Sequence, residues 1–293
     1  MTSNIDHRRA IALLCFCALC WSTAGVFTRL LDNAEGFQIT FWRSLFCAAG
    51  VFAALLWTQG RHALVALVSM GLPGLVSGAM WAVMFTCFML ALTRTSTANT
   101  LLVSSLSPLF AAILSRVVLG ERVGPGTWLA IAAALGGIWW MVRDGVSGEG
   151  AIGMMIALGV PVAAAINLVT LRRMRARVDL APAVLVGAVI SCAATLPLAW
   201  PVAASAWDLS ILALLGLGQL ALPCMLLVRV ARHLAPQEIA LIGLLEVVLG
   251  PIWSWLGAGE AMAASTVQGG VVVLAALAAN AWLSPSRAAA TPP

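Results

Sequence analysis

The sequence predicts an all-α integral membrane protein with ten transmembrane helices in two inverted five-helix repeats. Hydrophobic residues make up 62% of the 293 residues and charged residues only 9%, whereas soluble domains are about half apolar and about a quarter charged. Apolar runs of about 20 residues, long enough to cross a bilayer, recur along the chain. Two similar segments lie five such runs apart. These three observations together predict the fold class.

The apolar runs are separated by short polar turns that leave no room for a soluble domain. The first run follows His7-Arg8-Arg9, which resembles the head of a signal peptide. It is too long for a signal peptide and lacks an Ala-x-Ala cleavage site, so we expect an uncleaved helix. The ten predicted spans are 10–31, 37–58, 68–92, 97–118, 126–143, 151–171, 181–201, 208–230, 237–257 and 266–284.

The arginines predict how these spans are oriented. All sixteen basic residues are arginine, and twelve fall on the side of the N-terminus if the chain crosses ten times. Positive charge accumulates in cytoplasmic loops, so we expect both termini in the cytoplasm, with Arg172-Arg173-Met174-Arg175-Ala176-Arg177 as the strongest marker. The four arginines on the opposite side are Arg29, Arg43, Arg94 and Arg143.

An internal repeat relates the two halves. The 15 residues from Ser107 to Glu121 and from Glu246 to Glu260 align without a gap at an offset of 139, and both end in Gly-Glu. Five spans in each half invert the second half, which is the architecture of many secondary transporters. We therefore expect repeats at 1–145 and 146–293, with Gly120-Glu121 and Gly259-Glu260 on opposite sides of the membrane as loop or helix-end groups.

Prolines interrupt four of the spans and free the carbonyl four residues earlier in each. Freed carbonyls need partners in lipid unless they line a wet cavity, so spans four, six, eight and nine are expected to line one. We also expect Gly250-Pro251 to interrupt span nine. The four prolines and the carbonyls they free are Pro108 and Ser104, Pro161 and Ala157, Pro223 and Gln219, and Pro251 and Val247.

Glu246 lies about nine residues inside span nine, or about 14 Å along a helix. An acidic side chain at the bilayer centre costs about 2.5–3.5 kcal/mol on insertion scales, which the surrounding Leu, Ile and Val residues offset. Three interpretations remain open: the carboxyl carries a coupling proton, it pairs with the ammonium group of a substrate, or it bonds a neighbouring helix.

Other side chains at membrane depth complete the predicted substrate site. Aromatic walls suit apolar solutes, and neutral polar groups hydrogen-bond either a ligand or another helix. Asn99, near a span end, has helix capping as its alternative. Arg43 is interpreted as snorkelling to the outer interface, with binding of a carboxylate as the alternative. With Glu246, the candidate residues are Trp21, Ser22, Trp81, Phe85, Asn99, Ser104, Ser107, Asn167 and Gln219.

These residues carry a family resemblance. Trp21-Ser22 in span one, Phe41-Trp42-Arg43 in span two and the Pro…Gly-Glu runs of spans four and nine resemble the EamA-type carriers of the drug/metabolite transporter superfamily. More narrowly, the sequence is similar to amino-acid exporters of that superfamily. Val247 stands where the second repeat of the family often has proline, with Pro251 one turn later.

The resemblance implies a multi-pass secondary transporter of the bacterial inner membrane that exports aromatic and other neutral amino acids by alternating access. The alternatives are an exporter of cationic or hydrophobic drugs, and an uncoupled metabolite facilitator or channel. Proton coupling stays open. Expected partners are the small-molecule substrate and the lipid bilayer, without nucleic acid.

The sequence lacks the motifs of the main enzyme classes. No phosphate-binding Gly-x-x-x-x-Gly-Lys loop, His-Glu-x-x-His or Gly-x-Ser-x-Gly occurs, so we expect no enzyme and no cofactor. Cys17-Ala18-Leu19-Cys20 has the Cys-x-x-Cys spacing, but it lies in an apolar span and has no histidine companion, which disfavours a metal. Small-residue faces at Ala132/Gly136 and Ala133/Gly137 suit close helix packing or a subunit contact, so the expected state is a monomer or weak homodimer.

Overall fold

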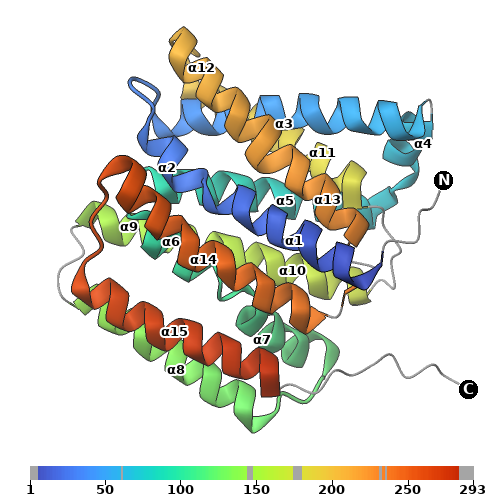
Figure 1. The fold of residues 1–293 in the computed structure, drawn as a ribbon. Helices are drawn as coiled ribbons and strands as arrows, with labels where there is room; N and C mark the ends of the chain where they lie inside the picture. Colours follow the sequence, from blue (N-terminus) through green and yellow to red (C-terminus); the bar gives the residue numbers. More distant parts are fainter. Residues whose placement is uncertain are drawn as a thin grey trace, which may run out of the picture.

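The computed structural model describes residues 6–60, 62–143, 148–173, 180–230, 233–234 and 236–283. Every regular element in this part of the chain is a helix (Figure 1). In chain order the helices are α1 (His7–Ser22), α2 (Ala24–Arg29), α3 (Gly36–Gln59), α4 (His62–Ser69), α5 (Gly71–Leu92), α6 (Thr97–Ser104), α7 (Ser107–Leu119), α8 (Pro125–Arg143), α9 (Gly148–Ala157), α10 (Gly159–Arg173), α11 (Leu180–Ala199), α12 (Ala206–Ala213), the π-helix η1 (Leu214–Ala221), α13 (Leu222–Val230), α14 (Pro236–Ala258) and α15 (Ala264–Leu283).

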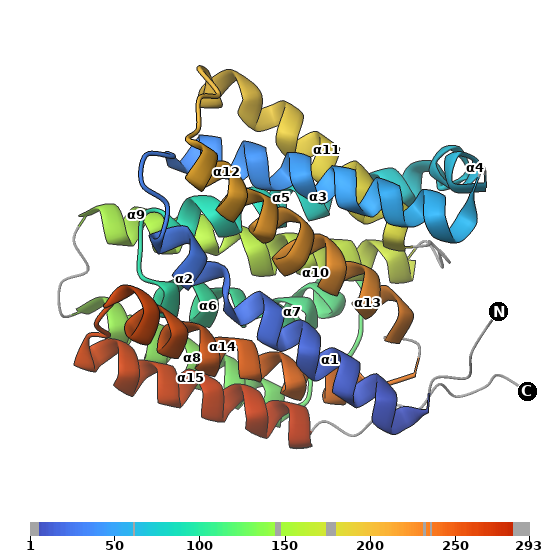
Figure 2. The same cartoon turned by 45° about the horizontal axis from the view of Figure 1, so that its top comes forward.

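The long helices lie side by side in a bundle with two ends (Figures 1 and 2). We call them the His7 end, where α1 begins and α15 ends, and the Arg29 end, where α2 ends. The helices α8 and α15 pack together on one flank, while α3 and α11 pack together on the opposite flank. The helices α1, α5, α10 and α14 lie between these flanks.

Nine helical stretches in the described part of the chain are long and apolar enough to cross a membrane, so this is a multi-pass membrane protein. The tenth predicted span, 126–143, is helical as α8, but the side chains of its last two residues lie outside the described set, and the count of ten stays a prediction. The short helix α4 was not predicted. Five arginines used for the orientation lie outside the described residues: Arg61, Arg175, Arg177, Arg232 and Arg287.

Three of the four predicted helix interruptions are confirmed. Ser105 and Leu106 form a turn between α6 and α7 just before Pro108, and Leu158 separates α9 from α10 before Pro161. Before Pro223 the span widens into the π-helix η1. A proline cannot donate to the carbonyl four residues earlier, and the preceding turn rearranges to compensate.

The predicted interruption at Gly250-Pro251 is wrong. The helix α14 continues from Pro236 to Ala258 with Pro251 inside it. A proline removes one hydrogen bond, and packing among neighbouring helices preserves the rest of a membrane helix. Gly250 packs directly against the side chain of Leu101 in α6, so contact with the neighbour keeps α14 in place.

The two Gly-Glu segments end their helices in the same way. Gly120 and Gly259 adopt positive φ angles of 69° and 66° after α7 and α14, a conformation that glycine adopts without strain. The next amide then donates back into the helix, Glu121 to the carbonyl of Ser115 at 3.4 Å and Glu260 to that of Ser254 at 3.1 Å. This shared local structure supports the predicted repeat.

The flank pair α8 and α15 crosses at glycines. Gly137 lies so near α15 that an added Cβ would sit 2.8 Å from the carbonyl oxygen of Gly269 and 2.9 Å from Val273. The neighbouring Gly136 has nothing within 4 Å of such a position. One of the two small-residue faces of α8 therefore makes close packing within the chain.

We expect Gly137→Ala to destabilise the protein by about 1–3 kcal/mol, because a methyl group has no room against the α15 backbone. The matched variant Gly136→Ala adds the same methyl group to open space, and should be neutral or stabilising by up to about 1 kcal/mol. Thermal unfolding in detergent measures both. Equal melting temperatures for the two variants would contradict the close crossing.

Candidate functional site

Arg43 lies buried inside the bundle, about seven residues or roughly 10 Å from the start of α3. Its side chain is only 2% exposed. One guanidinium nitrogen, Nη2, donates to Oε1 of Gln219 at 2.9 Å, and the guanidinium carbon lies 5.9 Å from the centre of the Phe88 ring. The interpretation of Arg43 as snorkelling to the interface is therefore wrong, because an amide oxygen and an aromatic face replace water inside the bundle.

The Nε atom of Arg43 is buried without a hydrogen-bond partner. A guanidinium has five N–H donors and binds a carboxylate best through two of them. Gln219 is neutral, so its hydrogen bond leaves the positive charge of Arg43 uncompensated. This combination is typical of a site that receives an anionic group.

Gln219 belongs to the π-helix η1 and links the helices α3 and α1. Its side chain is 3% exposed, and while Oε1 accepts from Arg43, Nε2 donates to the backbone oxygen of Trp21 at 3.2 Å. The carbonyl of Gln219 is the one that Pro223 frees, and π-helical turns of this kind are frequent at functional sites. Gln219 thereby fixes α3 against α1 at the level of Arg43.

The first span breaks at Thr23, between α1 and α2, where no proline predicts it. Two hydroxyls donate to backbone carbonyls three residues earlier, Ser22 to Leu19 and Thr23 to Cys20, each at 2.7 Å. Such bonds compete with the helical ladder and bend helices. Ser22 also accepts a hydrogen bond from the Trp253 indole of α14 at 3.0 Å.

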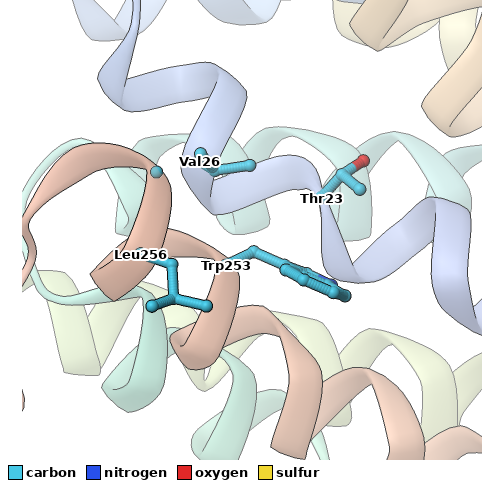
Figure 3. A pocket seen from close by; sticks show the side chains of 5 residues that line it. Thr23, Val26, Trp253 and Leu256 are labelled. Atoms are coloured by element: carbon cyan, nitrogen blue, oxygen red, sulfur yellow. The ribbon is translucent and has the colours of Figure 1, made fainter.

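A shallow apolar pocket of about 450 Å³ lies beside this break. Its lining residues come from α2, α14 and the break itself, and Figure 3 shows four of the side chains around the opening. The lining is Thr23, Val26, Trp253, Leu256 and Gly257, without an ionisable group. The pocket therefore includes neither Arg43 nor Gln219.

Glu246 is the acidic counterpart of Arg43. It lies half-buried near the middle of α14, and the charge of Arg43 acts on its carboxyl. Within the described residues, Glu246 makes no hydrogen bond and no ion pair within 4.0 Å. The two opposite charges thus attract each other without direct contact.

The aromatic candidates pack in one apolar group. Phe85 is 4% exposed and belongs to a buried apolar group against which Trp21 and Trp81 both pack. The rings of Trp81 and Phe85 lie 5.5 Å apart, and Nε1 of Trp81 is buried without a partner. Trp81 therefore offers an apolar face together with an unused donor.

The remaining polar candidates divide by their partners. The hydroxyl of Ser104 donates to Thr100, and that of Ser107 donates to the Ser104 carbonyl at 2.8 Å, which satisfies the oxygen that Pro108 frees. Asn167 keeps a buried Oδ1 without a partner. In the part of the chain that the structure describes, no hydrogen bond joins these three residues to Arg43.

Asn99 has both of its side-chain polar atoms hydrogen-bonded to other residues. Its Nδ2 donates to Thr95 at 3.2 Å, and its Oδ1 accepts from Thr266 of α15 at 3.3 Å. The cap of α6 is Ser96, whose hydroxyl accepts from the amide of Asn99. The structure thus gives the Asn99 side chain a role in joining α6 to α15.

Comparison with known proteins gives the family. A model of the EamA-like transporter family matches residues 8–143. Over these residues, the chain is similar to that family. A solved crystal structure of another protein shares the fold of the transporter at 22% identity, with a TM-score of 0.64, over 92% of this chain and 96% of its own.

The transporter is also similar to the pseudopaline exporter CntI of Pseudomonas aeruginosa, in strains UCBPP-PA14 and PAO1. Each match is 27% identical over 247 residues, which is 82% of this chain and 84% of the relative. The family resemblance predicted from the sequence is confirmed. Both matches indicate a membrane transporter.

We expect Gln219→Leu to destabilise the transporter by about 1–3 kcal/mol, because it leaves the buried guanidinium of Arg43 with fewer partners. The control Gln268→Leu makes the same exchange at an exposed position of α15, where it removes one neutral hydrogen bond from Trp140, and should cost less, at most about 1 kcal/mol. Thermal unfolding in detergent compares them. The bridging role of Gln219 would be refuted if both variants unfolded at the wild-type temperature.

Proposed function

We propose that this transporter exports small zwitterionic metabolites across the bacterial inner membrane, with aromatic and other neutral amino acids as the first candidates. The observation that carries the proposal is the buried guanidinium of Arg43, whose Nε has no partner. A substrate carboxylate would complete the donor fork of this arginine. Removing that carboxylate from water is costly unless such a partner receives it.

The opposite charge of Glu246 supports a zwitterion over a simple anion. Its carboxyl has no ion-pair partner in the described residues and lies within the electrostatic reach of Arg43. A molecule with an ammonium group beside its carboxylate offers the carboxylate to Arg43 and the ammonium group to Glu246. The half-buried rings of Trp21 and Trp81, with Phe85, provide apolar surface for a substrate side chain.

Transport would proceed by alternating access of the two proposed repeats, residues 1–145 and 146–293, around this site. We further propose cytoplasmic termini, on the basis of the arginine distribution. The direction of transport follows the relatives, which are exporters. Ser104, Ser107 and Asn167 remain proposed contacts for parts of a substrate beyond its two charged groups.

Pseudopaline is the second candidate substrate. The observation that favours it is the similarity to a pseudopaline exporter over 82% of this chain. Direct competition compares the two candidates. Pseudopaline inhibits amino-acid transport only if both bind the same site.

Counterflow in proteoliposomes tests the proposal. Vesicles preloaded with unlabelled phenylalanine should take up labelled phenylalanine faster than empty vesicles, because a carrier exchanges solute. Phenethylamine lacks the carboxylate, phenylpropionate lacks the ammonium group, and neither should compete well. Pseudopaline and a cationic drug complete the panel. If no amino acid competed, the proposed substrate class would be wrong.

We expect Arg43→Lys to raise the phenylalanine concentration for half-maximal counterflow by about tenfold or more, because a lysine has a point charge in place of the planar fork. Hydrogen bonds to charged groups contribute about 1.5–3 kcal/mol. The control Arg116→Lys changes an exposed arginine that also lies over an aromatic ring, Trp128, and should behave as wild type. Equal effects of both variants would contradict binding at Arg43.

Glu246→Gln distinguishes the two functional interpretations of Glu246, a coupling proton and binding of the substrate ammonium group. If Glu246 carries a coupling proton, the variant should exchange substrate but lose the pH dependence of transport. If it binds the ammonium group, affinity for phenylalanine should fall while phenylpropionate binds as well as before. The measurement is counterflow between pH 5 and 8, with the exposed Glu35→Gln as control. An unchanged rate, affinity and pH profile would remove both functional interpretations.

A further inference from the structure

At the Arg29 end, one ion pair is bound into the protein. Nε of Arg29 lies 3.0 Å from Oε2 of Glu260, and the two side chains are 30% and 17% exposed. Arg29 also donates to the backbone oxygen of Thr95 at 2.8 Å. Glu260 accepts from the amide of Thr97 at 2.6 Å and from its hydroxyl at 2.9 Å. We call Arg29–Glu260 the docked pair, because it binds the first turn of α6.

This docking is favourable for two reasons. Thr97 begins α6, and the start of a helix attracts a carboxylate through its free amides and its dipole. The contact is also closely packed, because Ser254 of α14 donates to the Thr97 hydroxyl at 3.0 Å. Gly25 of α2 lies against both side chains, with no room for a Cβ. The helices α2, α6 and α14 therefore meet at this end of the bundle.

At the His7 end, a second ion pair has the same components in an exposed form. Nη1 of Arg172 lies 3.9 Å from Oε2 of Glu121, and the side chains are 49% and 43% exposed. Exposed pairs of this kind contribute little to stability. We call Arg172–Glu121 the exposed pair.

The glutamates of the two pairs are related by the predicted repeat, and the arginines, 143 residues apart, occupy similar places in it. Glu121 and Glu260 are 139 residues apart, and both follow glycines of positive φ at the ends of α7 and α14. Arg29 and Arg172 both stand in the last turn of a broken span, the first span of each predicted repeat. Each pair joins the first half of the chain to the second, with arginine and glutamate exchanged between the halves.

We propose that these two pairs are reciprocal latches that close alternately at the two ends of the transporter, an inference that rests on the proposed alternating access. The docked pair holds the Arg29 end closed in this conformation. Opening that end requires Glu260 to leave Thr97. The His7 end closes when Glu121 docks on the start of α14, the counterpart of α6 in the other half.

One further ion pair at the His7 end does not serve as a latch. Nε2 of His7 lies 3.1 Å from Glu238, at the starts of α1 and α14. These two helices pack directly against each other. At the offset of 139, Glu238 corresponds to the uncharged Asn99, so this pair has no counterpart at the Arg29 end.

Distances across each end test the proposal. In a variant without the seven native cysteines, spin labels at Arg94 and Ala261 report the Arg29 end, and labels at Arg122 and His233 report the His7 end. All four positions are exposed, and the offset of 139 exchanges the two label pairs. Double electron–electron resonance measures both distances in the absence of substrate. Counterflow first shows that the cysteine-free protein still transports.

Glu260→Gln should shift the Arg94–Ala261 population towards the longer distance by about tenfold and shorten the Arg122–His233 distance. Glu121→Gln should leave the Arg29 end closed. If Glu260→Gln fails to fold, Thr97→Val decides, because it removes the hydroxyl contact and keeps the ion pair; it should lengthen the same distance. Unchanged distances in the folded variant, or equal changes from Glu121→Gln, would overturn the latches.

The two proposals fail in different ways. If no amino acid supports counterflow while the distances respond as expected in a pseudopaline-exchanging or drug-exchanging protein, the substrate class is wrong and the latches stand. If amino acids exchange while the distances do not respond to Glu260→Gln or Thr97→Val, the site stands and the latches are wrong.

Discussion

The hydrogen bond between Arg43 and Gln219 is the interaction on which the centre of this protein depends. A charge held inside a membrane bundle is costly unless polar groups surround it. Gln219 supplies one such group and, through its amide nitrogen, ties the same point to the backbone of α1. Because the partner is neutral, the charge is positioned but not cancelled. The site thus keeps its attraction for an anion while the empty protein remains folded.

The broken helices around this bond serve the same end. The carbonyls inside a continuous helix are hydrogen-bonded within it. The break at Thr23 and the π-helix η1 leave backbone groups that side chains can hydrogen-bond. In the first half of the chain, the hydroxyl of Ser107 likewise donates to the carbonyl of Ser104. Polar chemistry is therefore concentrated where regular structure is interrupted, and the flanks stay apolar.

Much of this architecture could be predicted from the sequence, because span length and proline position leave strong local signals. Nine spans and the interruptions before Pro108, Pro161 and Pro223 follow from these signals. The depth of Arg43 does not. A span that is apolar on every side carries no information about which face is buried, so nothing near Arg43 along the chain indicates that its side chain turns inward.

The other differences have similarly local causes. Pro251 was expected to interrupt α14, but the packing of Gly250 against Leu101 is a contact between distant segments and leaves no trace in either one. The break at Thr23 depends on hydroxyl rotamers, which residue type alone does not determine. Asn99 was a candidate by polarity, yet its partner Thr266 lies 167 residues away.

The break in span one differs in kind from the three made by proline. A proline imposes its missing hydrogen bond in every conformation, so those bends are permanent features of their helices. At Ser22 and Thr23 the bend is held by the hydrogen bonds of two side-chain hydroxyls, which rotation of those side chains would release. Span one therefore has no covalent constraint at its break, unlike the spans that contain Pro108, Pro161 and Pro223.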